Sequence, residues 1–211
     1  MKTTSQVDRV TEARHLSPLS AMRPATLDNI EKAVRKLFAG FDANEVTMAQ
    51  IAKTANVSLQ TLYKYFGDKQ TLFYTIMDRV LGRLASRMID HLQGIDSVEE
   101  RLRKTLWVCF DFVDSHPDAV MVLYSVSELH FRNIAIYENK ELIDAFLTVL
   151  EDGQTRGVLN DTVPLYTLFD VFMGFINRLG LMHIIRQTET PIIAEFDALF
   201  VILWRAISKP E

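Results

Sequence analysis

Hydrophobic positions recur every three or four residues along most of the chain after residue 25, which is the period of amphipathic α-helices. Ile30, Val34 and Leu37 form one stripe of a first helix, which we expect to begin near Ala25 and to end around Gly40. The same period predicts further helices at residues 69–92, 97–115, 117–131, 138–156, 165–187 and 192–207. No strand pattern interrupts them, so the sequence predicts an all-α fold.

Two shorter helices with a tight turn between them are predicted within residues 47–66. Thr47 can accept a hydrogen bond from the first turn of a helix, and Gln50 can reach back to it, which is a capping box. Asn56 tolerates the left-handed conformation that ends a helix sharply. Ser58 is a second N-cap. This spacing is that of a helix-turn-helix, whose second helix enters the major groove of DNA.

The second of these helices, residues 59–66, has a polar outer face. Leu62 and Phe66 are expected to face the core. The outward positions combine base-edge hydrogen bonders, an aromatic ring and a cation, a mixture that suits DNA contact. These positions are Gln60, Thr61, Tyr63 and Lys64. Packing in a small helical core remains an alternative for the aromatic side chains.

At these positions the chain resembles the TetR (tetracycline repressor-like) family. The residues that carry the resemblance are TMAQIA at 47–52, ANVS at 55–58, TLYKYF at 61–66 and DKQTL at 68–72. The resemblance implies an N-terminal three-helix DNA-binding domain over residues 25–84, with its motif at 47–66. A flexible arm at residues 1–24 would precede it. A C-terminal helical bundle at residues 85–211 would bind an effector and form a dimer.

The resemblance also implies roles for individual side chains. Thr47 and Lys69 would hold phosphates, because helix N-termini present free amides and a positive dipole end. Ser58 would cap its helix or bond a phosphate, and Arg23 would reach the minor groove. Base edges would be met by Gln60, Thr61 and Lys64, and the backbone or thymine methyl groups by Tyr63 and Tyr65. The sequence departs from the family pattern at Asn56, where glycine is more common, and at Gln60, where a small residue or proline is frequent.

Charge is divided unevenly along the chain. The net charge is −4, yet residues 1–90 carry 13 Lys and Arg against 9 Asp and Glu. The basic end is therefore the candidate for phosphate contact. The lone Cys109 cannot form an intramolecular disulfide, which fits a reducing cytoplasm. The most apolar stretch, residues 171–185, is interrupted by Asn177, Arg178 and His183, so we expect no membrane span.

The C-terminal part is rich in methionine and aromatic residues, which line adaptable apolar cavities as well as ordinary cores. Because the resemblance implies an effector pocket there, we expect a largely hydrophobic effector. The expected lining is Trp107, Phe110, Tyr124, Phe131, Met173 and Asn177. Core packing remains an equal alternative for each of these residues.

Asn177 and Arg178 lie in an otherwise apolar helix, where burying an unpaired charge costs on the order of several kcal/mol. They are therefore expected to have partners. Either they anchor a polar end of the effector, or Arg178 pairs with an acid such as Asp170 or Glu128 across the bundle or a dimer seam.

The last two predicted helices carry more apolar surface than a small bundle hides, and in the resembled family they form the dimer interface. We expect a homodimer that binds a palindromic double-stranded operator. The resemblance implies that it represses transcription, and activation is the alternative. Effector binding would favour a conformation whose reading heads no longer match the operator.

Other classes of function are weaker. An all-helical enzyme would need converging acids, but Glu99–Glu100 and Glu151–Asp152 are adjacent pairs that point about 100° apart on a helix. A scaffold that no longer binds DNA is a third possibility. A metal sensor would use His116, His130 and His183, which lack ligand spacing, and Cys109 has no second thiol for a redox switch. We expect no catalytic residues, metal or cofactor.

Overall fold

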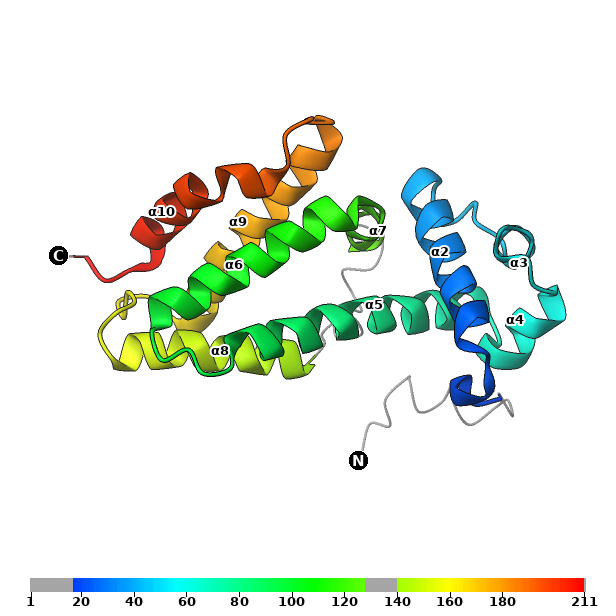
Figure 1. Cartoon of the computed structure of the whole chain (residues 1–211), viewed down its shortest axis with the longest axis horizontal. Coiled ribbons are helices and arrows are strands. Elements are labelled where there is room, and N and C mark those ends of the chain that lie inside the picture. The colour runs from blue at the N-terminus through cyan, green and yellow to red at the C-terminus, as the bar shows by residue number, and fades with distance from the viewer. Residues whose placement is uncertain (1–16, 128–139, 211) are drawn as a thin grey trace, which may run out of the picture. The chain divides into compact units, whose positions relative to one another are not determined.

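The computed structural model describes residues 17–127 and 140–210 (Figure 1). Within these ranges the chain is helical and contains no strand, so the predicted all-α fold is confirmed. The chain divides into two compact units, residues 1–77 and 78–211. The division falls within one continuous helix, α5 (Lys69–Leu92), and not after residue 84 as expected from the sequence.

The first unit contains a short 3₁₀ turn, η1 (Leu19–Ala21), and the helices α2 (Pro24–Gly40), α3 (Met48–Ala55) and α4 (Leu59–Phe66), followed by the start of α5. Helix α3 contacts both α2 and α4. Ile30 and Leu62 are fully buried, as the sequence predicted, and so is Ile51 of α3. The rings of Phe38 and Phe73 lie 4.6 Å apart and tie α2 to the start of α5.

Residues 17–23 belong to the packed unit, which corrects part of the expected arm. The backbone N–H of Ser17 donates to the carbonyl of Lys64 at 3.1 Å, and Met22 is buried. Pro24 occupies the first turn of α2, where its fixed φ suits a helix and its missing N–H costs nothing. Seven residues are too few to show a helical period, so this packing could not be predicted from the apolar pattern. Residues 1–16 of the expected arm lie outside the described ranges.

The second unit is a bundle around α6 (Val98–Ser115), which contacts every other helix of the unit that follows it in sequence. Its core includes the fully buried side chains of Leu102, Leu106 and Phe110. The other elements after α5 are α7 (Pro117–Ser127), α8 (Lys140–Thr155), α9 (Leu165–Ile185), the 3₁₀ turn η3 (Ile192–Glu195) and α10 (Phe196–Ile207). The expected helix ends at 128–131 and 138–139 lie outside the described residues.

Asp114 fastens the end of α6 to the turn between α9 and α10. Its carboxylate oxygens accept hydrogen bonds from the backbone N–H groups of Ile192 at 3.0 Å and Ile193 at 3.2 Å. His183 Nε2 lies 3.4 Å from the same carboxylate. These contacts satisfy the free amides at the start of η3 and give His183 a structural partner.

Gly153 marks a close approach within the second unit. A Cβ atom there would lie 2.5 Å from Cδ1 of the buried Leu159 and 2.9 Å from Cγ1 of Val98. The loop after α8 can fold back only because this position has no side chain.

Replacing Gly153 by alanine should therefore destabilise the protein by about 1–3 kcal/mol through overpacking. Gly82 in α5 is the matched control, because a Cβ there meets nothing within 4 Å. Gly82→Ala should stabilise its helix by up to about 1 kcal/mol. Urea unfolding of both variants measures the difference. If the Gly153→Ala variant were as stable as the Gly82→Ala variant, the Leu159 side chain would have moved aside without a loss of stability.

Candidate functional site

Helix α3 begins with the predicted capping box. The backbone N–H of Thr47 donates to Oε1 of Gln50 at 2.7 Å, and the backbone N–H of Gln50 donates to Oγ1 of Thr47 at 3.2 Å. Val46 and Ile51 on either side of the cap are both buried, which are the positions of a hydrophobic staple. The cap and the buried pair together fix the residue at which α3 starts.

The turn after α3 has the predicted left-handed residue. Asn56 has φ 53° and ψ 47°, and the backbone N–H of Val57 donates to the carbonyl of Ala52 at 3.0 Å. Ser58 Oγ then accepts from the backbone N–H of Thr61 at 3.0 Å and lies 2.7 Å from the Thr61 hydroxyl. Of the two roles considered for Ser58, the structure therefore places its hydroxyl in the cap of α4.

Four side chains form the exposed face of α4, which we call the reading face. Gln60 and Lys64 are exposed, and Tyr63 is 49% exposed, as the sequence predicted. Leu59 is the fourth member, at 40% exposure, and was not among the predicted contacts. Its position one turn before Tyr63 was the available signal, because residues four apart share a helix face.

Two predicted contacts flank this face. Thr61 is half-buried, and its hydroxyl is already bonded to that of Ser58. Tyr65 is also half-buried, with the ammonium of Lys64 5.3 Å from its ring centre. Both side chains lie between the reading face and the core.

Lys69, the expected phosphate contact of α5, also has a structural partner. Its Nζ donates to the carbonyl of Ala43 at 2.9 Å and so holds the loop between α2 and α3. An ammonium group has three donors, which leaves two for a phosphate. Asp68 caps the same helix start by accepting from the backbone N–H of Thr71 at 2.7 Å.

The second unit contains an apolar cavity of about 340 Å³, within the size range of small-molecule sites. Side chains from α5, α6, α7, α8 and α9 form its wall. Met173 and Asn177 line it, as expected from the sequence. Asn177 is at the same time exposed to solvent, so its amide lies at the mouth of the cavity.

Other residues of the predicted lining lie elsewhere. Phe110 is fully buried in the core of the unit and does not line the cavity. Trp107 is on another face of α6, where its ring lies 4.3 Å from the ammonium of Lys104 and 5.6 Å from the guanidinium of Arg87. Phe131 and the side chain of Tyr124 lie outside the described part of the chain.

Asn177 and Arg178 are both exposed, so the expectation that burial forces them to find partners is wrong. The apolar neighbours that prompted it lie on the other faces of α9. Neither acid considered as a partner is joined to Arg178 here: Asp170 is exposed about two turns earlier on the same side of α9, and Glu128 lies outside the described residues.

Cys109 faces the cavity from α6. Burial raises the pKa of its thiol to about 12, so the group stays protonated at physiological pH. A protonated thiol is a weak nucleophile, which disfavours the redox switch considered from the sequence.

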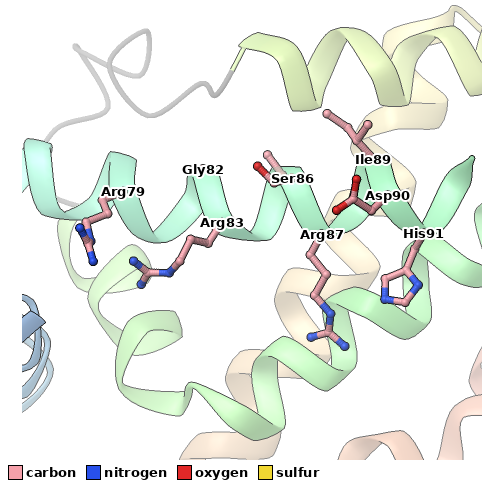
Figure 2. A pocket seen from close by; sticks show the side chains of 9 residues that line it. Arg79, Gly82, Arg83, Ser86, Arg87, Ile89, Asp90 and His91 are labelled. Atoms are coloured by element: carbon pink, nitrogen blue, oxygen red, sulfur yellow. The ribbon is translucent and has the colours of Figure 1, made fainter. Parts of the chain in front are cut away.

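A basic stripe follows one side of α5. Figure 2 shows Arg79, Arg83, Arg87 and His91 extending from successive turns on the same side of the helix. Arg87 is paired with Asp111 at 2.5 Å and lies against the Trp107 ring. The stripe is therefore partly neutralised by its own unit.

The acid pairs considered for an enzyme have structural roles. Glu99 and Glu100 lie in the first turn of α6, where the helix dipole stabilises negative charge. A hydrogen bond from Arg101 holds the pKa of Asp152 below its ordinary value. Across residues 17–127 and 140–210, no three His, Cys, Asp or Glu side chains gather into a possible metal site.

The segment that contains the reading face matches a known protein family. Residues 30–75 match the family of bacterial regulatory proteins described as the tetR family. The HTH-type transcriptional regulator HbdR of Aromatoleum sp. is 28% identical over 60% of this chain and 50% of its own length. The HTH-type transcriptional repressor NicS of Pseudomonas putida is 26% identical over 65% of this chain and 68% of its own. Residues 30–75 of this chain therefore carry the domain described for the tetR family.

The chain spans only half the length of HbdR, but its likeness to solved structures of regulators extends over both units. The fatty acid degradation regulator FadR from Bacillus halodurans superimposes with a TM-score of 0.76 at 17% identity, covering 87% of this chain and 96% of FadR. FadR from Bacillus subtilis in complex with stearoyl-CoA gives a TM-score of 0.71 at 18% identity, covering 83% of this chain and 96% of that one. At these identities the likeness establishes the fold.

Replacing Thr47 by alanine should lower the free energy of unfolding by about 1 kcal/mol, because the backbone N–H of Gln50 loses its acceptor. Thr47→Ser keeps the hydroxyl and should retain most of the stability. Thermal or urea unfolding of the two variants tests this, and a stable alanine variant would mean that water replaces the cap.

Cys109 should react slowly with iodoacetamide in the folded protein. At pH 9 a thiol with a pKa of about 12 is ionised roughly several hundred times less than an ordinary thiol. The labelling rate should therefore rise by that order on unfolding in urea. Mass spectrometry of the alkylated protein measures it, and fast labelling in the native state would contradict the raised pKa of this half-buried thiol.

Proposed function

We propose that the protein is a dimeric repressor that binds a palindromic operator through α4 and is released by an apolar effector held in the cavity of its second unit. The observation that carries the proposal is the reading face, whose four exposed side chains serve neither the cap nor the core of their unit. The family match and the named repressor NicS support it.

Helix α4 would lie in the major groove. Gln60 can donate to and accept from a base edge, and Leu59 and Tyr63 offer apolar surface to thymine methyl groups. Lys64 would reach a guanine edge or a phosphate. The half-buried Tyr65 and Thr61 would contact DNA only at the edge of the interface.

Phosphate contacts would come from helix starts on either side of α4. The first turns of α3 and α5 present backbone amides beside Thr47 and Lys69, and the dipole of each helix favours an anion there. Because the Thr47 hydroxyl and the Ser58 hydroxyl already serve caps, their contribution to DNA binding would be mainly to orient these amides.

A second copy of the chain would cover α9 and α10. Among the described residues, α9 is the one helix with the length and composition to cross a membrane, yet only 22% of its most apolar window is buried. Exposed apolar side chains continue onto the neighbouring helix: Tyr166, Val171 and Ile185 on α9, and Val201 and Ile202 on α10. A patch of this kind, shared by two adjacent helices, is typical of a protein interface.

The effector would be an amphiphile with a long alkyl chain. The cavity wall is almost entirely apolar, with the amide of Asn177 at its mouth to receive a polar end. The structural likeness to FadR in complex with stearoyl-CoA supports this chemical class. Helix α5 contributes Leu81, Leu84 and Met88 to the wall and continues into the first unit, so a ligand that shifts α5 can change how the reading faces fit the operator.

Gln60→Ala and Lys64→Ala should each weaken binding to a selected operator duplex by about 1–3 kcal/mol, with Gln60→Ala also relaxing the preference at one base pair. Lys209→Ala removes a cation of the second unit that is bonded to Asp161, and should leave DNA binding unchanged. Fluorescence anisotropy with an operator recovered from random duplexes measures the affinities at two salt concentrations. If neither α4 variant loses affinity, α4 is not the reading helix.

Ala145→Phe should block the response to effector while preserving DNA binding, because Ala145 lines the cavity and a phenyl group would fill part of it. Ala194→Phe, at an exposed position in η3, is the control. In the native protein and the control, stearoyl-CoA or stearate should weaken operator binding by at least about fivefold. A response in Ala145→Phe equal to that of the native protein would remove the cavity from the mechanism.

A further inference from the structure

Asp170, Gly174 and Arg178 form a single ridge on the exposed side of α9. They are spaced four residues apart, so they follow one another on successive turns of the helix. All three are exposed, and the ridge passes through the middle of the 21-residue helix. It carries an acid at one end, a base at the other and no side chain between them.

The two charges have no partner in the described part of their own chain. Eight residues of helix separate them by about 12 Å along the axis, which is too far for an ion pair. No hydrogen bond or ion pair joins either side chain to another described residue, whereas Arg103 of α6 and Asp197 of α10 are paired with each other. The unpaired charges lie beside the exposed apolar side chains of Val171 and Ile185.

Gly174 is unexplained by its own chain. A Cβ atom at this position would meet nothing within 4 Å, in contrast to Gly180 in the same helix, where it would lie 2.9 Å from Val113. A glycine in a helix interior is unfavourable because of its backbone entropy. Space on the outer side of α9 is therefore left open at the midpoint between two opposite charges.

We infer that α9 crosses α9 of a second copy at Gly174, with Asp170 of each copy paired to Arg178 of the other. This rests on the dimer proposed above and specifies its register. When ridges of residues four apart lie along each other in opposite directions, helices pack in the commonest of the crossing classes. A two-fold axis at Gly174 then brings the acidic end of each ridge to the basic end of its mate.

The absent side chain at Gly174 lets the two backbones approach, and the pairs on both sides are equivalent by symmetry. The adjacent apolar side chains are removed from water by the same contact. The apolar residues of this face alone would let the two α9 helices pack in several registers. The charges of the ridge select one of them.

The test is a charge-reversal exchange followed by analytical ultracentrifugation at about 0.1 M salt. Asp170→Arg and Arg178→Asp each place like charges opposite one another, and each should raise the dimer dissociation constant at least about tenfold. An equimolar mixture of the two variants should form a heterodimer with nearly native affinity, as should the double variant with itself. Gly174→Leu should weaken the native dimer to a similar extent, and circular dichroism confirms that each variant is helical.

A native dimer that both single variants leave intact would overturn this register while keeping the dimer. A mixture that fails to restore association, although both variants are folded, would overturn it equally. Loss with Asp170→Arg but not with Arg178→Asp would assign Asp170 to another base, such as the exposed Arg205 of α10, and would also overturn the pairing. A native protein that stays monomeric at every concentration would refute the proposed dimer itself.

Discussion

Each helix of this chain must bury its apolar surface. Where the chain's own packing leaves apolar surface exposed, we expect a binding partner or ligand. In the first unit the requirement is met internally, since Leu62 and Phe66 hold α4 and leave its other side to polar groups. In the second unit α6 is surrounded by helices, but α9 carries apolar residues on more sides than the bundle covers. The same constraint accounts for the cavity, where five helices meet without filling the space between them.

The local features of the reading head were predictable because they are short-range. The capping box, the left-handed Asn56 and the Ser58 cap each involve residues at most five apart, so the chain needs no tertiary context to specify them. The packing of Met22 and the bond from Lys69 to Ala43 depend instead on distant segments. No periodicity in the sequence reports such contacts.

The cavity residues show more clearly which features cannot be predicted from the sequence. Phe110 and Met173 both lie in helices that are apolar on several faces, and only the packing of neighbouring helices decides that Met173 meets the cavity while Phe110 fills the core. Asn177 and Arg178 were expected to be buried because their neighbours in sequence are apolar. They are exposed because the outer side of α9 has no cover from its own unit. Sequence identifies an apolar helix, but the direction of each of its faces is a tertiary property.

The separation of tasks on α4 has an evolutionary consequence. Thr61 and Ser58 hold the turn together and Leu62 and Phe66 hold the core, whereas Leu59, Gln60, Tyr63 and Lys64 do neither. Exposed substitutions of this kind usually change stability by less than about 0.5 kcal/mol. After gene duplication, drift at these four codons could carry a daughter protein to a new binding sequence through folded intermediates, with the scaffold that presents them left under purifying selection.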